Sequence, residues 1–331
     1  MGVFCALKPP GDVHRRENIV RPFRWLTMAI LALLLAACSG GAPRDAEVVI
    51  PPGASIARAG EILEKAGAVS ASSFRNHARL FGGGDPIKPG EYKIEKGMDA
   101  GDILRLLQSG KTIQRIVMIP EGMPSIMVRD RLMAEQRLKG DIAVPAEGSI
   151  LPDSYAFTTG ETRAAVVARM QAAMDRTFAE LWARRSPRTA VKDRNEAMTL
   201  ASIVEKETSL ASERRTVAGV YTNRLAIGMK LQADPTIIYP ITRGKPLGRR
   251  ILRSEILAVN DYNTYSMIGL PKGPIANPGK ASIAAVLDPE ANDYLYFVAR
   301  GDGGHVFART LSEHNANVQK WYQLRRERGE M

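Results

Sequence analysis

The chain has 331 residues and a formal net charge of +11, a length that allows two domains and a charge that favours anionic polymers or membrane surfaces as partners. No helix-turn-helix, zinc-finger or RNP-type pattern is present, so we do not expect nucleic acid to be a partner. The 2 cysteines, Cys5 and Cys38, precede the body of the chain and the 4 histidines lack a ligand spacing, so we expect no disulfide framework, no metal and no cofactor.

The N-terminal region carries an export or anchoring signal. Arg21 and Arg24 precede an apolar run over residues 25–38. As a helix this run spans about 21 Å, short of a hydrocarbon core of roughly 30 Å, so its length favours a signal peptide over a membrane span. Its end, Leu35-Ala-Ala-Cys-Ser-Gly40, resembles a bacterial lipoprotein box. That resemblance implies cleavage before Cys38 and a lipid on its thiol.

An uncleaved, tilted single span is the alternative interpretation of this segment. Either interpretation places residues 45–331 outside the cytoplasm at a membrane, and we expect the periplasmic face of the inner membrane. We therefore divide the first part of the chain into a signal or anchor over residues 1–38 and a linker over residues 39–47.

Residues 48–140 are predicted to form a small α/β module. Ser55 is a candidate N-cap, and apolar residues follow it at helical spacing up to Gly67. The predicted order is a strand over 48–53, helices over 56–66 and 72–81, a strand over 91–94 and a helix over 99–109. This order resembles a LysM-like glycan-binding module. Residues 118–122 and a predicted helix over 125–138 repeat the strand–turn–helix order, although two unrelated turns would give the same pattern.

Residues 141–331 are predicted to form a larger mixed domain, which makes the whole chain α+β. An aromatic loop over 147–157 precedes helices over 161–185, from about 195, and over 217–227. Loops rich in Gly, Pro and Asn dominate after Gly228. Strands are then predicted at 294–298 and after a turn at 301–304, and a helix at 311–325 closes the chain.

The stretch over residues 198–215 is predicted to be one helix that carries a carboxylate near its apolar side. At about 100° per residue, one face collects Leu200, Ala201, Ile203, Val204, Leu210 and Ala211. Glu207 lies about 30–60° from the centre of that face, Glu205 about 95–130° away, and Ser202 and Lys206 opposite. Desolvation of Glu207 would raise its pKa, as a general acid working near neutral pH requires. A paired Glu on a helix edge would give the same pattern.

Polar loop residues supply candidates for substrate binding. Gln232 and Asp234 lie in the stretch after Gly228, and Asn263, Tyr265 and Asn277 lie in the loop over 261–279. Tyr and Asn suit sugars, because a ring can stack and an amide both donates and accepts hydrogen bonds.

Several motifs in one fixed order resemble the endolytic murein transglycosylase family, the YceG-like proteins. They are Ala201-Ser-Ile-Val-Glu-Lys-Glu-Thr208, Val220-Tyr-Thr-Asn-Arg-Leu225, Gly228-Met-Lys-Leu-Gln-Ala-Asp-Pro-Thr236, Tyr262-Asn-Thr-Tyr265, Gly269-Leu-Pro-Lys-Gly-Pro-Ile-Ala-Asn-Pro-Gly279 and Tyr294-Leu-Tyr-Phe-Val298. The resemblance spans roughly residues 197–320 and extends more weakly to about residue 47. It assigns the catalytic role to Glu207, the residue that the helix geometry also selects. Members usually carry a transmembrane helix, and the lipobox-like end at Cys38 departs from that pattern.

The resemblance implies cleavage of the MurNAc–GlcNAc β-1,4 bond inside peptidoglycan strands, without water, to leave 1,6-anhydro-MurNAc ends. One Glu serves both proton transfers, so the carboxylate pair of an ordinary glycosidase is not required. Asp234 and Glu213 are open to two interpretations, as a second carboxylate or as helix and turn caps. Gln232, Asn263, Tyr265 and Asn277 are candidates to support the transition state or to structure the loops.

Two functional hypotheses remain from the sequence. The first is a membrane-anchored lytic transglycosylase that acts on glycan strands, beside a peptidoglycan synthase as the resemblance implies. The second is a non-catalytic peptidoglycan-binding scaffold of the envelope, in which Glu207 is structural. The retained motif around Glu207 favours the enzyme.

Overall fold

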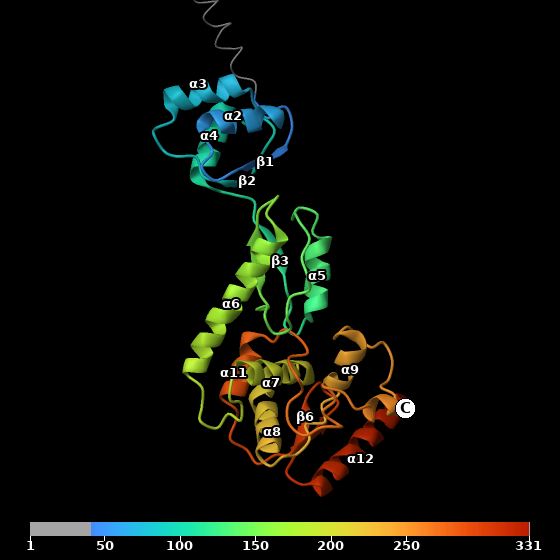
Figure 1. Cartoon of the computed structure of the whole chain (residues 1–331). Coiled ribbons are helices and arrows are strands. Elements are labelled where there is room, and N and C mark those ends of the chain that lie inside the picture. Colours follow the sequence, from blue (N-terminus) through green and yellow to red (C-terminus); the bar gives the residue numbers. More distant parts are fainter. Residues whose placement is uncertain (1–40, 331) are drawn as a thin grey trace, which may run out of the picture. The chain divides into compact units, whose positions relative to one another are not determined.

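The computed structural model describes residues 41–330, which form two compact units divided between Ile113 and Gln114 (Figure 1). Small antiparallel sheets accompany helices in both units, which confirms the predicted α+β class. Cys38 and the predicted anchor lie outside the described residues.

The described part of the first unit, residues 41–113, contains two strands and three helices. In chain order they are β1 (Ala46–Ile50), α2 (Ile56–Lys65), α3 (Ala71–Phe81), β2 (Gly90–Ile94) and α4 (Ala100–Ser109). The predicted cap at Ser55 is present, since its hydroxyl accepts a hydrogen bond from the Arg58 amide at 3.2 Å. Asp99 caps α4 in the same way and forms a capping box with Asp102. Local sequence therefore determines where these helices begin.

The core of the first unit forms between the β1–β2 ladder and the three helices. β1 and β2 run antiparallel, with Val48 opposite Tyr92. Alternate strand residues face inward, and they pack on the apolar faces of the helices. The largest fully buried side chains here are Ile50, Leu63, Phe74, Tyr92, Ile94, Ile103 and Leu107.

The second unit begins with a ladder that the sequence did not reveal. β3 (Arg115–Met118) pairs antiparallel with β4 (Ser154–Phe157), so the segment predicted as a loop over 147–157 ends in a strand. The intervening α5 (Ser125–Ala134) ends before the predicted residue 138. Because β3 and α5 pack with β4 and α6 (Arg163–Ala183), the predicted boundary at residue 140 falls inside this unit.

The rest of the second unit surrounds one central helix, α7 (Arg194–Glu207). Residues 197–204 of α7 are all buried, and the helix contacts α8, α9 and α11. The other elements are α8 (Arg214–Ala226), α9 (Pro235–Thr242), α10 (Arg253–Ile256), α11 (Lys280–Leu287), β5 (Tyr296–Ala299), β6 (His305–Ala308) and α12 (Leu311–Glu327).

The central helix is shorter and more enclosed than its periodicity predicts. It ends at Glu207, so Leu210 and Ala211 lie beyond it and do not extend its apolar face. Ser202 was predicted on the polar side but is buried, where its hydroxyl accepts a hydrogen bond from the Ile275 amide at 3.0 Å. Neighbouring helices cover α7 on several sides, and a small hydroxyl can be buried once it is hydrogen-bonded.

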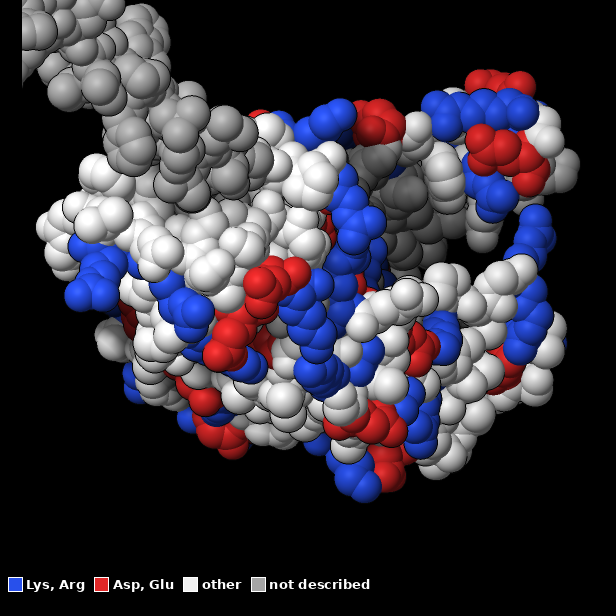
Figure 2. Space-filling model, turned by 90° about the horizontal axis from the view of Figure 1, so that it is seen from above, with Lys and Arg blue, Asp and Glu red and all other residues white. Residues whose placement is uncertain are grey.

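The surface carries charges of both signs. On the face seen in Figure 2, Lys and Arg side chains lie interspersed with Asp and Glu side chains. Among residues 41–330, no helix is both long and apolar enough to cross a membrane.

Candidate active site

Glu207 is the last residue of α7, and its carboxyl group lines a cavity at the end of that helix. The buried residues before it fix the direction in which the helix points. Thr208 ends the helix in an extended conformation, and its hydroxyl accepts a hydrogen bond from the Leu210 amide at 3.1 Å. A helix carries partial negative charge at its carbonyl end, so the ionised form of Glu207 is disfavoured by its position alone.

The cavity has a volume of about 330 Å³ and brings together segments that are far apart in the sequence. Charged, amide and aromatic groups share its walls, a combination that suits a sugar with both polar edges and apolar faces. The lining residues are Glu207, Tyr221, Arg224, Gln232, Asp234, Tyr265, Tyr296, Phe297, Leu311 and His314.

The cavity environment holds Glu207 near the midpoint of its titration at neutral pH. Burial raises the pKa of Glu207 from 4.5 to about 7, and the negative charge of Asp234 acts in the same direction. A hydrogen bond with the Tyr221 side chain and the positive charge of Arg224 lower the pKa but do not outweigh the burial. A carboxyl group with such a pKa can give up a proton in one step and accept one in the next.

Asp234 and Tyr265 form a fixed pair beside Glu207. The Tyr265 hydroxyl donates a hydrogen bond to Oδ1 of Asp234 at 2.6 Å. Burial raises the pKa of Tyr265 well above its usual 10, so the phenol remains a donor. The second oxygen of Asp234 is left for other contacts, and the charge of Asp234 helps to keep Glu207 protonated.

Gln232 enters the cavity wall from a strained backbone. Its φ angle of 49° lies in the left-handed region, where a residue other than glycine is uncommon. The Gln232 amide donates to the Thr264 carbonyl at 3.3 Å, and the neighbouring Ala233 amide donates to the Thr264 hydroxyl at 3.0 Å. Strain that the surroundings impose in this way is concentrated at functional sites.

Arg224 joins the loop before α9 to strand β5. Its Nε donates to the Leu295 carbonyl and its Nη1 to the Leu231 carbonyl, both at 2.6 Å. The guanidinium carbon lies 5.5 Å from the centre of the Tyr296 ring. Arg224 therefore fixes two walls of the cavity and places a positive charge near Glu207.

Glu205 has a structural environment and does not line the cavity. Its side chain is only 5% exposed, although the helix geometry predicted it well away from the apolar face. One carboxylate oxygen of Glu205 accepts a hydrogen bond from the Gly279 amide at 2.8 Å, and the other lies 3.5 Å from Nη2 of Arg214. The two glutamates of this motif therefore have different surroundings, and Glu207 is the one that faces the cavity.

Three other candidates from the sequence lie outside the cavity. Asn263 is buried, and its amide nitrogen donates to the carbonyls of residues 255, 256 and 258. Asn277 is also buried and binds the Met123 carbonyl at 2.9 Å through its side chain. Oε1 of Glu213 accepts a hydrogen bond from the His305 amide at 2.9 Å, and its Oε2 lies 2.7 Å from Nδ1 of the His305 ring. All three side chains hold loops in place.

The sequence profile of the YceG-like family matches residues 48–320. This chain belongs to the YceG-like family. It is 27% identical over 311 residues to an endolytic murein transglycosylase of Bacillus subtilis, covering 84% of this chain and 85% of that protein. An endolytic murein transglycosylase of Streptococcus pneumoniae is 28% identical, and the match covers 82% of this chain but 57% of that longer protein.

A crystal structure of a yceG-like protein from Listeria monocytogenes shows the same fold. The two chains are 29% identical in sequence, and their structures superpose with a TM-score of 0.51. The match covers 83% of this chain and 99% of the other. The motifs that carry the sequence resemblance include Glu205 and Glu207 of α7 and the loop that carries Gln232 and Asp234.

Sequence reasoning missed several residues that line the cavity of this YceG-like chain. Tyr221 and Arg224 lie three residues apart and thus on one face of α8. A tyrosine and an arginine on the buried face of an amphipathic helix are the signal that could have identified them. Tertiary packing of β5 and α12 brings four more residues to the site, namely Tyr296, Phe297, Leu311 and His314.

The described residues contain no group of His, Cys, Asp or Glu side chains that could hold a metal ion.

Proposed function

We propose that this chain is a lytic transglycosylase that cleaves the MurNAc–GlcNAc β-1,4 bond within peptidoglycan strands and leaves 1,6-anhydro-MurNAc ends during growth and remodelling of the cell wall. Family membership and the relatives named endolytic murein transglycosylases support this substrate and reaction. The observation that carries the proposal is Glu207, a carboxyl group with a pKa of about 7 in a cavity suited to sugars.

Glu207 performs both proton transfers in the proposed reaction. The protonated carboxyl first gives its proton to the oxygen of the glycosidic bond, and that bond breaks as positive charge develops on C1 of MurNAc. The resulting carboxylate then takes the proton of the C6 hydroxyl, whose oxygen bonds to C1. The proton lost in the first step returns in the second, so the enzyme is regenerated and no water is consumed.

The polar groups around Glu207 support its cycle. The negative charge of Asp234, held by Tyr265, favours the protonated form of Glu207 before cleavage and stabilises the positive sugar during it. The Tyr221 hydroxyl and the Arg224 cation stabilise the carboxylate that forms after the first transfer. Gln232, on its strained backbone, is proposed to contact the glycan.

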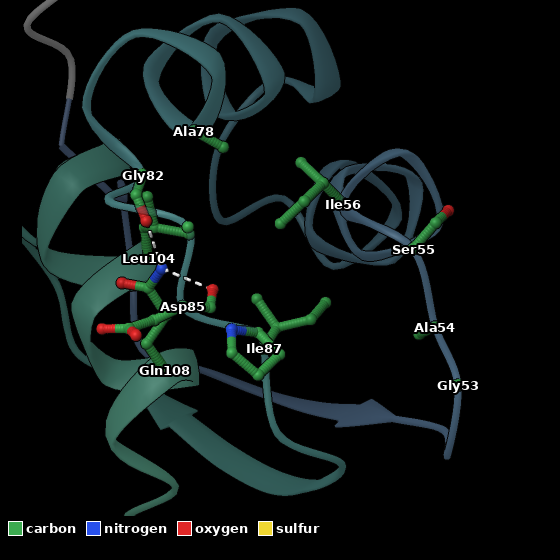
Figure 3. Close-up of a pocket in the computed structure, with 12 residues that line it drawn as sticks. Gly53, Ala54, Ser55, Ile56, Ala78, Gly82, Asp85, Ile87, Leu104 and Gln108 are labelled. Atoms are coloured by element: carbon green, nitrogen blue, oxygen red, sulfur yellow. Dashed lines mark hydrogen bonds between the residues drawn. The ribbon is translucent and has the colours of Figure 1, made fainter.

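The first unit is proposed to bind glycan in the manner of a LysM-like module. The β1–α2–α3–β2 order supports this assignment, and a cavity of about 460 Å³ lies between the β1–α2 and α3–β2 loops. Figure 3 shows Ile56 and Ile87 on its walls, and Gln108 donates to the carbonyls of Gly82 and Asp85 at 2.8 and 2.9 Å, which fixes the second loop. Apolar walls with fixed carbonyl groups suit a sugar ring.

The N-terminus is proposed to anchor the enzyme at the periplasmic face of the inner membrane, through a lipid on Cys38 or a single span. An anchored enzyme works on glycan close to the membrane, where new strands are made. A peptidoglycan synthase is the partner that this location and the family resemblance suggest.

Digestion of purified sacculi tests the proposed reaction. The wild-type protein should release fragments that end in anhydro-MurNAc, and mass spectrometry of the products identifies these ends. Glu207→Gln should release none, whereas Glu205→Gln serves as the matched control from the same helix turn. A protein that binds sacculi with no such products would instead be the non-catalytic scaffold.

A further inference from the structure

His314 lines the same cavity as Glu207 but comes from a different element, the first turn of α12. Its ring stacks on Tyr296, with centres 5.2 Å apart and planes inclined by 25°. α12 packs against β5, the strand that carries Tyr296. The imidazole is therefore held in a defined orientation at the cavity.

The two ring nitrogens of His314 have different surroundings. Nδ1 is enclosed and has no hydrogen-bond partner among the described residues. Nε2 likewise has no protein partner in this part of the chain, but it is not enclosed. An enclosed N–H without an acceptor is rarer in proteins than an enclosed acceptor without a donor. The proton of the neutral ring therefore belongs on Nε2, the nitrogen that remains accessible.

The charge state of His314 agrees with this tautomer. Burial lowers the pKa of His314 below its usual 6.5, and the nearby Arg224 cation lowers it further. A neutral imidazole next to a fixed arginine offers one directional donor without adding a second positive charge to the cavity.

We propose that His314 is a substrate-positioning residue, which donates a hydrogen bond from Nε2 to a neutral oxygen of the glycan bound against Tyr296. This inference rests on the proposed function and adds to it a contact on the wall formed by β5 and α12. The acceptor is a sugar hydroxyl or the carbonyl of an N-acetyl group. Because both proton transfers belong to Glu207, the bond orients the substrate and does not take part in the chemistry.

Steady-state cleavage of glycan strands by the full chain tests the proposal. His314→Phe keeps an aromatic ring on Tyr296 but removes the donor, whereas His314→Gln restores an N–H at a similar reach. We expect the phenylalanine variant to raise KM by about 2- to 10-fold, the effect of one neutral hydrogen bond, with kcat nearly unchanged. The glutamine variant should return KM most of the way to the wild-type value.

Asn315→Ala is the matched control, because this exposed residue is the next one in the same helix turn. Thermal unfolding of each variant separates a lost contact from a lost fold. Strands with de-N-acetylated GlcNAc identify the acceptor, since loss of an acetyl contact would raise KM for the wild type and leave the phenylalanine variant unaffected. Equal effects on both proteins would exclude the acetyl group of GlcNAc as the acceptor.

Two results would overturn the inference. One is an unchanged KM for a folded His314→Phe, and the other is a glutamine variant no better than phenylalanine. A wild-type protein that forms no anhydro-ended products would contradict the proposed function itself, so the two failures are distinguishable.

Discussion

The raised pKa of Glu207 predicts that replacing this residue stabilises the protein in a pH-dependent way. Below pH 4.5 the carboxyl is protonated in both the folded and the unfolded chain, so it adds no pH-dependent difference. As the pH rises, the unfolded chain releases its proton first, because the folded pKa is about 7. The folded state therefore loses stability between these two values, and the loss is constant above pH 7.

The size of the effect follows from the two pKa values. Each pKa unit corresponds to about 1.4 kcal/mol, so the interval from 4.5 to about 7 gives a loss of at most about 3 kcal/mol in the free energy of unfolding. Glu207→Gln removes the ionisable group and keeps a similar shape. We expect this variant to match the wild type near pH 4.5 and to exceed it by up to about 3 kcal/mol at pH 8.

Urea unfolding of wild type and variant at several pH values, followed by a signal from the second unit, measures this difference. Glu180→Gln is the control, because Glu180 is exposed on α6 and pairs only with exposed cations. A stability gain that is the same at pH 4.5 and pH 8 would show that Glu207 is not held protonated by its surroundings.

The other predictions concern activity and anchoring. Glu207→Gln should lower cleavage of sacculi by at least about 100-fold through loss of acid–base catalysis, whereas Glu205→Gln keeps most of the activity; rates on the same sacculi decide. Asp234→Asn should move the alkaline limb of the kcat–pH profile, which reports loss of the Glu207 proton, to lower pH, and an unmoved limb would count against its coupling to Glu207. A fragment over residues 114–331 should cleave soluble glycan strands but work poorly on intact sacculi, unless the first unit has no binding role. Cys38→Ala should prevent labelling by a palmitate analogue; an unlabelled wild type that still sediments with membranes would indicate a transmembrane anchor.

Local signals were sufficient for much of the fold. Ser55 caps α2 as predicted, because a cap depends on only three or four consecutive residues, and Asp99 caps α4 in the same way. The pairing of β3 with β4 was missed, since it joins segments separated by a helix and a long loop. α9 was missed because Pro235 and Pro240 suggest a loop, although Pro235 stands at the start of the helix, where proline is favoured, and only Pro240 lies inside it.

The site was predicted in part. Helical periodicity selected Glu207, and the polar loops supplied Gln232, Asp234 and Tyr265, which line the same cavity. Asn263 and Asn277 were chosen for their chemistry, but an asparagine amide satisfies buried carbonyls as readily as it binds sugars. The wall from β5 and α12 arises from tertiary packing, which no short sequence window contains.

The identity of the attacking oxygen is the most direct test of the proposed reaction. Digestion of sacculi in ¹⁸O-water distinguishes attack by the C6 hydroxyl from attack by water, because only water carries the label. With Glu207 serving both proton transfers, we expect unlabelled anhydro-MurNAc ends and cuts inside the strands. Label at new reducing MurNAc ends would show that water attacks C1, with Asp234 available to position it, and the transglycosylase assignment would be wrong.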